Sequence, residues 1–200
     1  MSNKLKLINL FLFFILHLFS ESDGSHSLYI NPDETLWGMG RNDYGQLGDG
    51  TNTDRNKSIY IDIGVSSVMA SSGNHSLYVK TDGTLWAMGR NQFGQLGDGT
   101  TTDRNSSVQI DSNVSSVTAG DMHSLYVKTD GTLWAMGRNS YGQLGDGTTT
   151  DRNSSVQIDS NVSSVTAGDM HSLYVKTDGT LWAMGRNSYG QLGDGTTTDR

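Results

Sequence analysis

The sequence predicts an all-β protein built from β-propeller blades of four short antiparallel strands, arranged as an incomplete arc of about three and a half blades. Three observations lead to this prediction: a 48-residue unit recurs along the chain, every unit contains a hairpin signature, and glycine supplies 25 of the 200 residues. Glycine makes up only about 7% of an average protein, so this excess indicates many tight turns between short strands.

The repeated unit is marked by the tetrapeptide His-Ser-Leu-Tyr, and each of its histidines is followed 11 residues later by a tryptophan. Residues 123–152 and 171–200 are identical, which indicates a tandem copy rather than a loose periodicity. The units that follow from this spacing are residues 26–74, 75–122, 123–170 and the partial unit 171–200.

Each unit predicts four strands. In the third unit, residues 123–128 and 132–137 are short, mostly apolar stretches separated by Thr-Asp-Gly. Asp-Gly in this position provides the positive φ angles that a tight β-hairpin turn requires. Residues 114–120 and 155–158 predict two further strands. No stretch of the repeats shows the apolar spacing of three and four residues that is typical of a helix, so we expect no helix there.

Face-to-face packing of blades would bury both faces of a middle strand, which explains why residues 123–128 are mostly apolar without clean alternation. Trp134 and Met136 fall on one face of the next strand. Because a tryptophan occupies this place in every unit, we interpret it as blade-to-blade packing rather than a ligand platform. His123 is interpreted as structural, since it and Ser124 point to opposite faces of the strand and make a poor catalytic dyad.

Residues 136–147, together with the Ala-Gly-x-x-His-Ser and Asp-Gly-Thr-Leu-Trp sequences before them, resemble the repeat of the regulator of chromosome condensation superfamily. A Gly-Gln-Leu-Gly corner recurs in every unit, and its leucine is expected to fill the gap between neighbouring blades. The resemblance implies a seven-bladed ring closed by strands from both chain ends. Because 200 residues are too few for seven such units, we expect a fragment that forms an open, curved stack of blades.

Functions known in that superfamily agree with this sequence to different degrees. Chromatin-bound members that exchange nucleotide on a small GTPase are basic where they face DNA, whereas this chain has a net charge of −7. The plant ultraviolet photoreceptor carries Gly-Trp-Arg-His-Thr where this chain reads Gly-Asp-Met-His-Ser over residues 120–124. Exported bacterial inhibitors of β-lactamases bind protein through loops on one face of the ring, and they are the precedent that best fits export and acidity.

The N-terminus has the pattern of a targeting segment. Two lysines precede residues 7–19, which are almost entirely apolar. This run is shorter than the roughly 20 residues that span a bilayer and suits the core of a signal peptide. We therefore expect a signal peptide over residues 1–22, cut near Ser22, and a propeller-repeat domain over 23–200 that is secreted or held in the cell envelope without membrane insertion. An uncleaved anchor is the alternative.

Composition argues against several kinds of chemistry. Cysteine is absent and glutamate occurs only at positions 21 and 34, so the repeats offer no thiol nucleophile and no glutamate pair. An acidic chain without a basic stripe predicts no nucleic-acid partner. The loop between Asp146 and Asp151 lacks the alternating aspartates and terminal glutamate of an EF-hand calcium loop, and the glycine-rich corners lack a phosphate-binding lysine. We predict neither a metal nor a cofactor.

The predicted function is therefore a non-catalytic protein-binding or interaction scaffold. Loops vary freely while strands are fixed by packing, so the partner-binding residues are sought in the loops between strands. They are Asn74, Asp121, Met122, Asp169 and Met170. Two other functions stay open: a structural or surface-display array without a specific ligand, which the near-identity of the units favours, and a propeller enzyme acting on an extracellular substrate.

Overall fold

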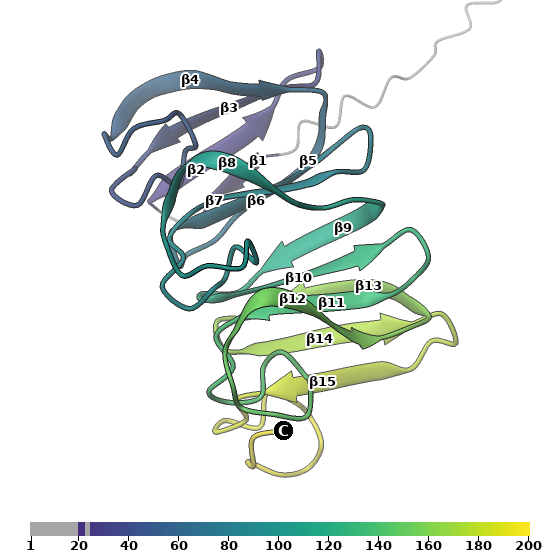
Figure 1. Ribbon diagram of the computed structural model, residues 1–200. Helices are drawn as coiled ribbons and strands as arrows, with labels where there is room; N and C mark the ends of the chain where they lie inside the picture. The colour runs from purple at the N-terminus through teal and green to yellow at the C-terminus, as the bar shows by residue number, and fades with distance from the viewer. Residues whose placement is uncertain (1–19, 23–24) are drawn as a thin grey trace, which may run out of the picture.

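The computed structural model describes residues 20–22 and 25–200 of the chain. Four antiparallel sheets follow one another along the chain and stack face to face in an open column, with the first sheet at one end and the C-terminus at the other (Figure 1). We number these sheets as blades 1 to 4. All regular secondary structure among the described residues is β-strand, as the sequence predicts.

Each strand pairs with the next one along the chain, so every blade is a simple meander. Blade 1 contains β1 (Ser20–Ser22), β2 (His26–Ile30), β3 (Thr35–Gly40) and β4 (Arg55–Ile63). Blade 2 contains β5 (Val65–Ala70), β6 (His75–Lys80), β7 (Leu85–Gly89) and β8 (Arg104–Asp111). Blade 3 contains β9 (Val114–Ala119), β10 (His123–Lys128), β11 (Leu133–Gly137) and β12 (Arg152–Asp159). Blade 4 contains β13 (Val162–Ala167), β14 (His171–Lys176) and β15 (Leu181–Gly185).

The four strands predicted for the third unit are confirmed. The first and third differ from the prediction by one residue at an end, and the last differs by more. It is predicted over residues 155–158, whereas β12 runs from Arg152 to Asp159 and pairs with β11 as far as Gly137. The added residues are polar and carry no apolar pattern. Backbone hydrogen bonds to β11 hold this part of the strand, and no pattern of side chains in the sequence reveals such pairing.

The blades are offset from the repeated units, because each unit was counted from its histidine while blades 2 to 4 begin one strand earlier, with a Val-Ser-Ser-Val strand. In blade 1 the corresponding position is taken by the three-residue β1, which pairs with β2. This strand coincides with the end of the predicted signal peptide, residues 1–22, the rest of which lies outside the described residues. The boundary at Ser22 stays a prediction.

The order of strands fixes where each loop lies. The first strands β5, β9 and β13 lie side by side, so they form the inner edge of the stack, and the fourth strands form its outer edge. In an antiparallel meander, the loop after the first strand and the loop after the third strand lie at the same end of the blade. We call these the inner loop and the corner loop. The tight hairpin turns, such as the one at Gly131, lie at the opposite end.

The hydrophobic core lies between blades rather than within one sheet. Leu125, Leu133 and Leu144 of blade 3 pack with Tyr174 and Met184 of blade 4, and two equivalent clusters join the other blades. The corner leucines Leu47, Leu96 and Leu144 are completely buried in these clusters, as the sequence predicts. Burying one such side chain contributes about 2 kcal/mol.

The tryptophans also pack between blades. Trp134 and Met136 belong to the same cluster, between blades 2 and 3, which confirms that they share one face. Trp134 stacks on Tyr126 with ring centroids 6.4 Å apart, and the ammonium of Lys128 lies 4.9 Å from its centroid. Packing of this kind explains why the residue recurs in every unit.

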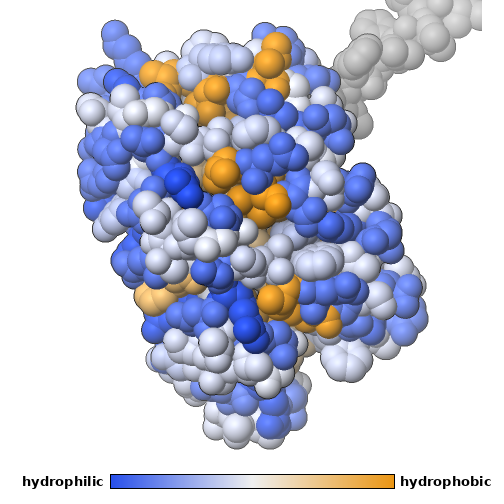
Figure 2. Space-filling view, in the orientation of Figure 1, coloured by the Kyte–Doolittle hydropathy of each residue, from blue (hydrophilic) through white to orange (hydrophobic). Residues whose placement is uncertain are grey.

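The surface of the stack is largely hydrophilic in the view of Figure 2, with separate hydrophobic patches between polar regions. Over residues 20–22 and 25–200, no helix has the length and apolar character needed to cross a membrane.

Candidate partner-binding face

The inner loops of blades 2, 3 and 4 are joined by hydrogen bonds. The Ser71 hydroxyl donates to the Gly120 carbonyl at 2.5 Å, and the Asp121 N–H donates to the Asp169 carbonyl at 3.2 Å. Gly73 approaches Asp121 so closely that an added Cβ would lie 1.3 Å from its carbonyl oxygen, so a side chain does not fit there. These contacts bring the predicted partner-binding residues to one surface, which we call the inner-loop face: Asn74, Asp121, Met122, Asp169 and Met170.

Asn74 is partly committed to the fold. Its φ of 62° lies in the left-handed region, which asparagine tolerates better than most residues. Its side-chain oxygen accepts a hydrogen bond from Gln46 Nε2 at 3.3 Å, and its backbone carbonyl accepts one from the Arg90 N–H at 2.9 Å. Asn74 therefore connects the corner loop of blade 1 to blade 2 in addition to lying at the inner-loop face.

The two aspartates of the face lie in different surroundings. Asp121 is half-buried and Asp169 is exposed. Burial raises the pKa of the Asp121 carboxyl, and the negative charge of Asp169 raises it further, while Arg90 and Arg138 act in the opposite direction. The ionised Asp121 carboxylate is consequently less favoured than one in water, and a cationic group from a partner would stabilise it.

A row of arginines lies beside these aspartates, with one from each of blades 2, 3 and 4. We define the arginine row as Arg90, Arg138 and Arg186. Each guanidinium lies over an aromatic ring in the corner loop of the preceding blade, at 5.1 Å from the Tyr44 centroid, 5.1 Å from Phe93 and 5.6 Å from Tyr141, respectively. Stacking holds a guanidinium in place while leaving its edge free to donate hydrogen bonds.

The methionines of the face contact the same arginines. Met122 Sδ lies 3.6 Å from Arg138 Nη1, and Met170 Sδ lies 3.9 Å from Arg186 Nη1. Both methionines are half-buried. The inner-loop face and the arginine row thus form one continuous surface. Its arginine, aromatic and methionine side chains are of the types that are enriched in protein interfaces.

The arginine row differs from the other arginines of the repeats in lacking an ion pair. The arginine that begins each outer strand pairs with a corner-loop aspartate, as Arg104 does with Asp98 at 2.7 Å. Within the part of the chain that the structure describes, no carboxylate lies within ion-pair distance of Arg90, Arg138 or Arg186.

The arginine row was not predicted from the sequence, because the net charge does not show where each charge lies. Its three guanidiniums follow one another along the blades, and two of them lie near Asp121. A signal was present in the sequence, since Arg-Asn-x-Tyr or Arg-Asn-x-Phe occurs in every unit, for example at residues 138–141. Its meaning depends on contacts between blades.

Each repeated histidine of blades 1 to 3 forms a hydrogen bond with a serine of the following blade. His123 Nε2 lies 2.8 Å from Ser172 Oγ, and the His26–Ser76 and His75–Ser124 pairs repeat this contact at 2.9 Å. Ser172 donates its proton to the Gln143 carbonyl at 2.8 Å, so the histidine Nε2–H must be the donor to serine. Burial and, to a smaller extent, the charge of His171 lower the pKa of His123 to about 3. This geometry is that of a structural histidine, as predicted.

The carboxylates of the corner loop accept hydrogen bonds from other groups of the same chain. Asp146 accepts hydrogen bonds from Asn139 Nδ2 at 3.0 Å and Thr148 Oγ1 at 2.7 Å, and it pairs with Arg152. Asp151 accepts one from the Asn139 N–H at 2.7 Å. Nowhere in residues 20–22 and 25–200 do three His, Cys, Asp or Glu side chains gather as a metal site.

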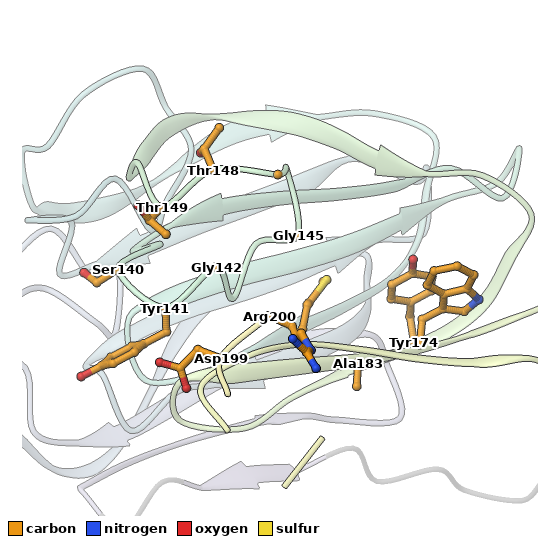
Figure 3. A pocket seen from close by; sticks show the side chains of 13 residues that line it. Ser140, Tyr141, Gly142, Gly145, Thr148, Thr149, Tyr174, Ala183, Asp199 and Arg200 are labelled. Atoms are coloured by element: carbon orange, nitrogen blue, oxygen red, sulfur yellow. The ribbon is translucent and has the colours of Figure 1, made fainter. Parts of the chain in front are cut away.

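A groove of about 690 Å³ lies between the corner loop of blade 3 and β15 (Figure 3). Tyr141 lines it on one side, and Tyr174 and Trp182 line it on the other. Arg200 pairs through its backbone with Gly185 at the edge of the groove. In blade 3 the equivalent space is filled by the outer strand β12, so the groove follows from the three-stranded form of blade 4.

Four-stranded antiparallel meanders that repeat along the chain and pack face to face define a protein of the β-propeller class. The pattern described as "Regulator of chromosome condensation (RCC1) repeat" matches residues 82–127 and 130–175, and a second pattern of the same description matches 67–95, 114–143 and 162–191. Together these matches extend over more than half of the chain, which belongs to the regulator of chromosome condensation repeat family.

Solved structures agree with this assignment. The chain is similar to human WBSCR16, with a TM-score of 0.76 and 24% identity over 88% of this chain and 48% of that chain. It is similar to yeast RCC1 (Prp20) bound to Kap60, with a TM-score of 0.74 and 21% identity over 88% and 45%. A structure of Prp20p from Saccharomyces cerevisiae, described with its binding properties to Gsp1p and histones, is similar with a TM-score of 0.71. The identity is 23%, over 88% of this chain and 47% of that chain.

These likenesses establish the fold, and the chain spans about half the length of the solved proteins that it matches. The comparison with curated proteins gives no match.

Proposed function

We propose that this chain is an exported, non-catalytic scaffold that binds a protein partner through the inner-loop face and the arginine row. The proposal rests on three stacked guanidiniums that have no ion pair, whereas each of the other arginines in the described repeats is ion-paired. Arginine, tyrosine and methionine are enriched in protein interfaces, and arginine is frequent among the residues that dominate binding energy.

The charges of this surface indicate the chemistry of the partner. Arg138 and Arg186 favour carboxylates on the opposing surface, while the exposed Asp169 favours a basic group beside them. A protein surface can present both signs at this spacing. A nucleic acid cannot, because its phosphates would meet Asp121 and Asp169 as well as the net charge of −7.

Family relatives support a protein partner in general terms. Yeast RCC1 (Prp20) has been crystallised bound to Kap60, and Prp20p has been described with its binding to Gsp1p and histones. Because the chain covers under half of those proteins, none of these partners is transferred to it. Export rests on the apolar run of residues 7–19, and the mass of the purified secreted chain tests it: cleavage before Asp23 is expected.

The binding proposal is tested by comparing two charge-matched double variants. Asp121→Asn with Asp169→Asn removes both carboxylates from the inner-loop face. Asp130→Asn with Asp178→Asn removes two from the hairpin turns at the opposite end of the blades, and asparagine keeps the acceptor oxygen that Thr132 and Thr180 use there. Each variant, and the unmodified chain, is used to capture proteins from the secreted fraction of producing cells.

We expect one protein to be captured by the unmodified chain and by the hairpin-turn variant, and to be reduced at least about tenfold by the inner-loop variant, since a lost charge pair in an interface costs about 1.4 kcal/mol or more. Equal loss in both variants, or retention by the inner-loop variant, would reject this surface as the binding site.

A structural or surface-display array is the second candidate, and it is favoured by the identity of residues 123–152 and 171–200. Identical blades present identical loops, whereas a specific asymmetric interface benefits from loops that differ. Capture of no protein above the level bound by the inner-loop variant would favour this candidate over the scaffold.

A further inference from the structure

The inner loops of blades 2 and 3 differ in one contact with the corner loop of the preceding blade. In blade 2, Gln46 Nε2 donates a hydrogen bond to Asn74 Oδ1 at 3.3 Å. Asn74 is the residue before the repeated histidine, and Met122 holds this position in blade 3. The amide oxygen that accepts the bond in blade 2 is therefore replaced in blade 3 by a thioether, which is only a weak acceptor.

The glutamine that faces Met122 is left with a buried donor. Gln95 is 0% exposed, and its Oε1 accepts a hydrogen bond from the Phe93 N–H at 3.0 Å, a bond that Gln46 repeats in its own corner loop. The two amides thus have the same orientation, and Gln95 Nε2 points toward Met122. Gln95 Nε2 has no hydrogen-bond partner among the residues that the structure describes. A buried amide donor without an acceptor is rare in native proteins, and a ligand that supplies one accounts for it.

A guanidinium is directed at the same methionine. Arg138 Nη1 lies 3.6 Å from Met122 Sδ, and Arg138 stacks on Phe93, in the loop that holds Gln95. Within the described ranges, Arg138 has no ion pair. The half-buried Met122 side chain consequently covers two donors, one charged and one neutral, that lack a strong acceptor. We call this place the Met122 subsite.

The same elements recur in blade 4. Met170 Sδ lies 3.9 Å from Arg186 Nη1, and Gln143 Oε1 accepts a hydrogen bond from the Tyr141 N–H at 3.0 Å. In blade 2, Arg90 Nε is a further buried donor without a partner in the described part of the chain. A guanidinium beside an amide N–H favours an anion with several acceptor lone pairs.

We propose that Met122 covers a carboxylate-binding subsite, and that it turns aside when an aspartate or glutamate side chain of the partner accepts hydrogen bonds from Arg138 and Gln95. Methionine suits this movement, because its unbranched side chain has three rotatable bonds. Asp121 and Asp169 lie beside the subsite and favour a carboxylate over a phosphate group, which carries a larger negative charge. The inference rests on the partner-binding function proposed above and names the chemical group that this surface binds.

Titration of the purified chain with sodium acetate, at neutral pH and constant ionic strength, tests the subsite by NMR. We expect saturable shifts of the Met122 methyl signal and of the Gln95 side-chain amide signals. Acetamide has the same shape without the charge and should shift neither. Met122→Ala removes the cover, and acetate should then bind at least about tenfold more tightly, measured at the Gln95 amide, because no side chain has to be displaced.

Met122→Asn is the matched variant, since asparagine at the same position of blade 2 accepts the bond from Gln46. Its amide oxygen should accept the hydrogen bond from Gln95 Nε2, so acetate binding in blade 3 should be lost. The Met170 methyl signal should keep its response to acetate, which shows that the fold is intact.

Four results would each overturn the proposal: equal shifts with acetate and acetamide, tighter binding of inorganic phosphate than of acetate, no response of Gln95 in the Met122→Ala chain, or unchanged acetate binding by Met122→Asn. These results do not depend on the capture of a partner. Acetate binding without any captured protein would reject the proposed function and leave the subsite standing. A captured protein without acetate binding would reject the subsite alone.

Discussion

Replacing one leucine in two sequence-identical surroundings gives a direct measure of the energy between blades. Leu133 and Leu181 occupy the same place in identical 30-residue segments, and they differ in exposure from 0% to 65%. Leu133→Ala removes a side chain packed between blades 3 and 4 and leaves a cavity behind. A loss of about 3 kcal/mol is expected, within the range measured for buried leucines in well-packed cores.

Leu181→Ala should cost much less. Full burial of a leucine contributes about 2 kcal/mol, and only about a third of this side chain is shielded, so the expected loss is below about 1 kcal/mol with no cavity contribution.

The assay must resolve single blades, because stability in a stack of repeats is shared only between neighbours. Amide hydrogen exchange measured at β11 and β15 does so, with urea denaturation of the whole chain as a second measurement. Equal losses in free energy of unfolding for the two variants would refute the argument that the core lies between blades.

Three further predictions concern the loops and the carboxylates. Gly73→Ala should separate the inner loops of blades 2 and 3 and destabilise the chain by about 2 kcal/mol or more, measured by urea denaturation, because its Cβ would meet the Asp121 carbonyl oxygen. Asp111 is half-buried, which raises its pKa, but hydrogen bonds from Lys128 and Tyr126 outweigh this effect and hold the pKa below 3.8. The stability that Asp111 contributes is therefore present above pH 3.8 and should be lost as the pH falls through its folded pKa. Asp111→Asn should reduce this acid sensitivity in a pH series of thermal unfolding. Asp121→Asn should stabilise the free chain at neutral pH, since burial and Asp169 raise the pKa of Asp121 and ionisation opposes folding; a lower melting temperature than that of the unmodified chain would contradict this.

Blades and strands could be predicted from the sequence because their signals are local. Asp-Gly turns lie between apolar stretches, and the period of 48 residues places each stretch in the same strand of successive blades. The burial of Leu144 was predicted from the recurring Gly-Gln-Leu-Gly corner. The shared face of Trp134 and Met136 follows from alternation within a strand. The extension of β12 to Arg152 was missed because an outer strand of polar residues is held by backbone pairing, for which side chains give no pattern.

The site was predicted in part, for a related reason. Asp121 and Asp169 could be placed in loops, yet their neighbours come from other blades. The hydrogen bond from Gln46 to Asn74, the contact between His123 and Ser172 and the stacking of Arg138 on Phe93 each join residues that are 28 to 49 positions apart. Such contacts depend on how one sheet is rotated against the next. That rotation cannot be predicted from the sequence of a single repeat.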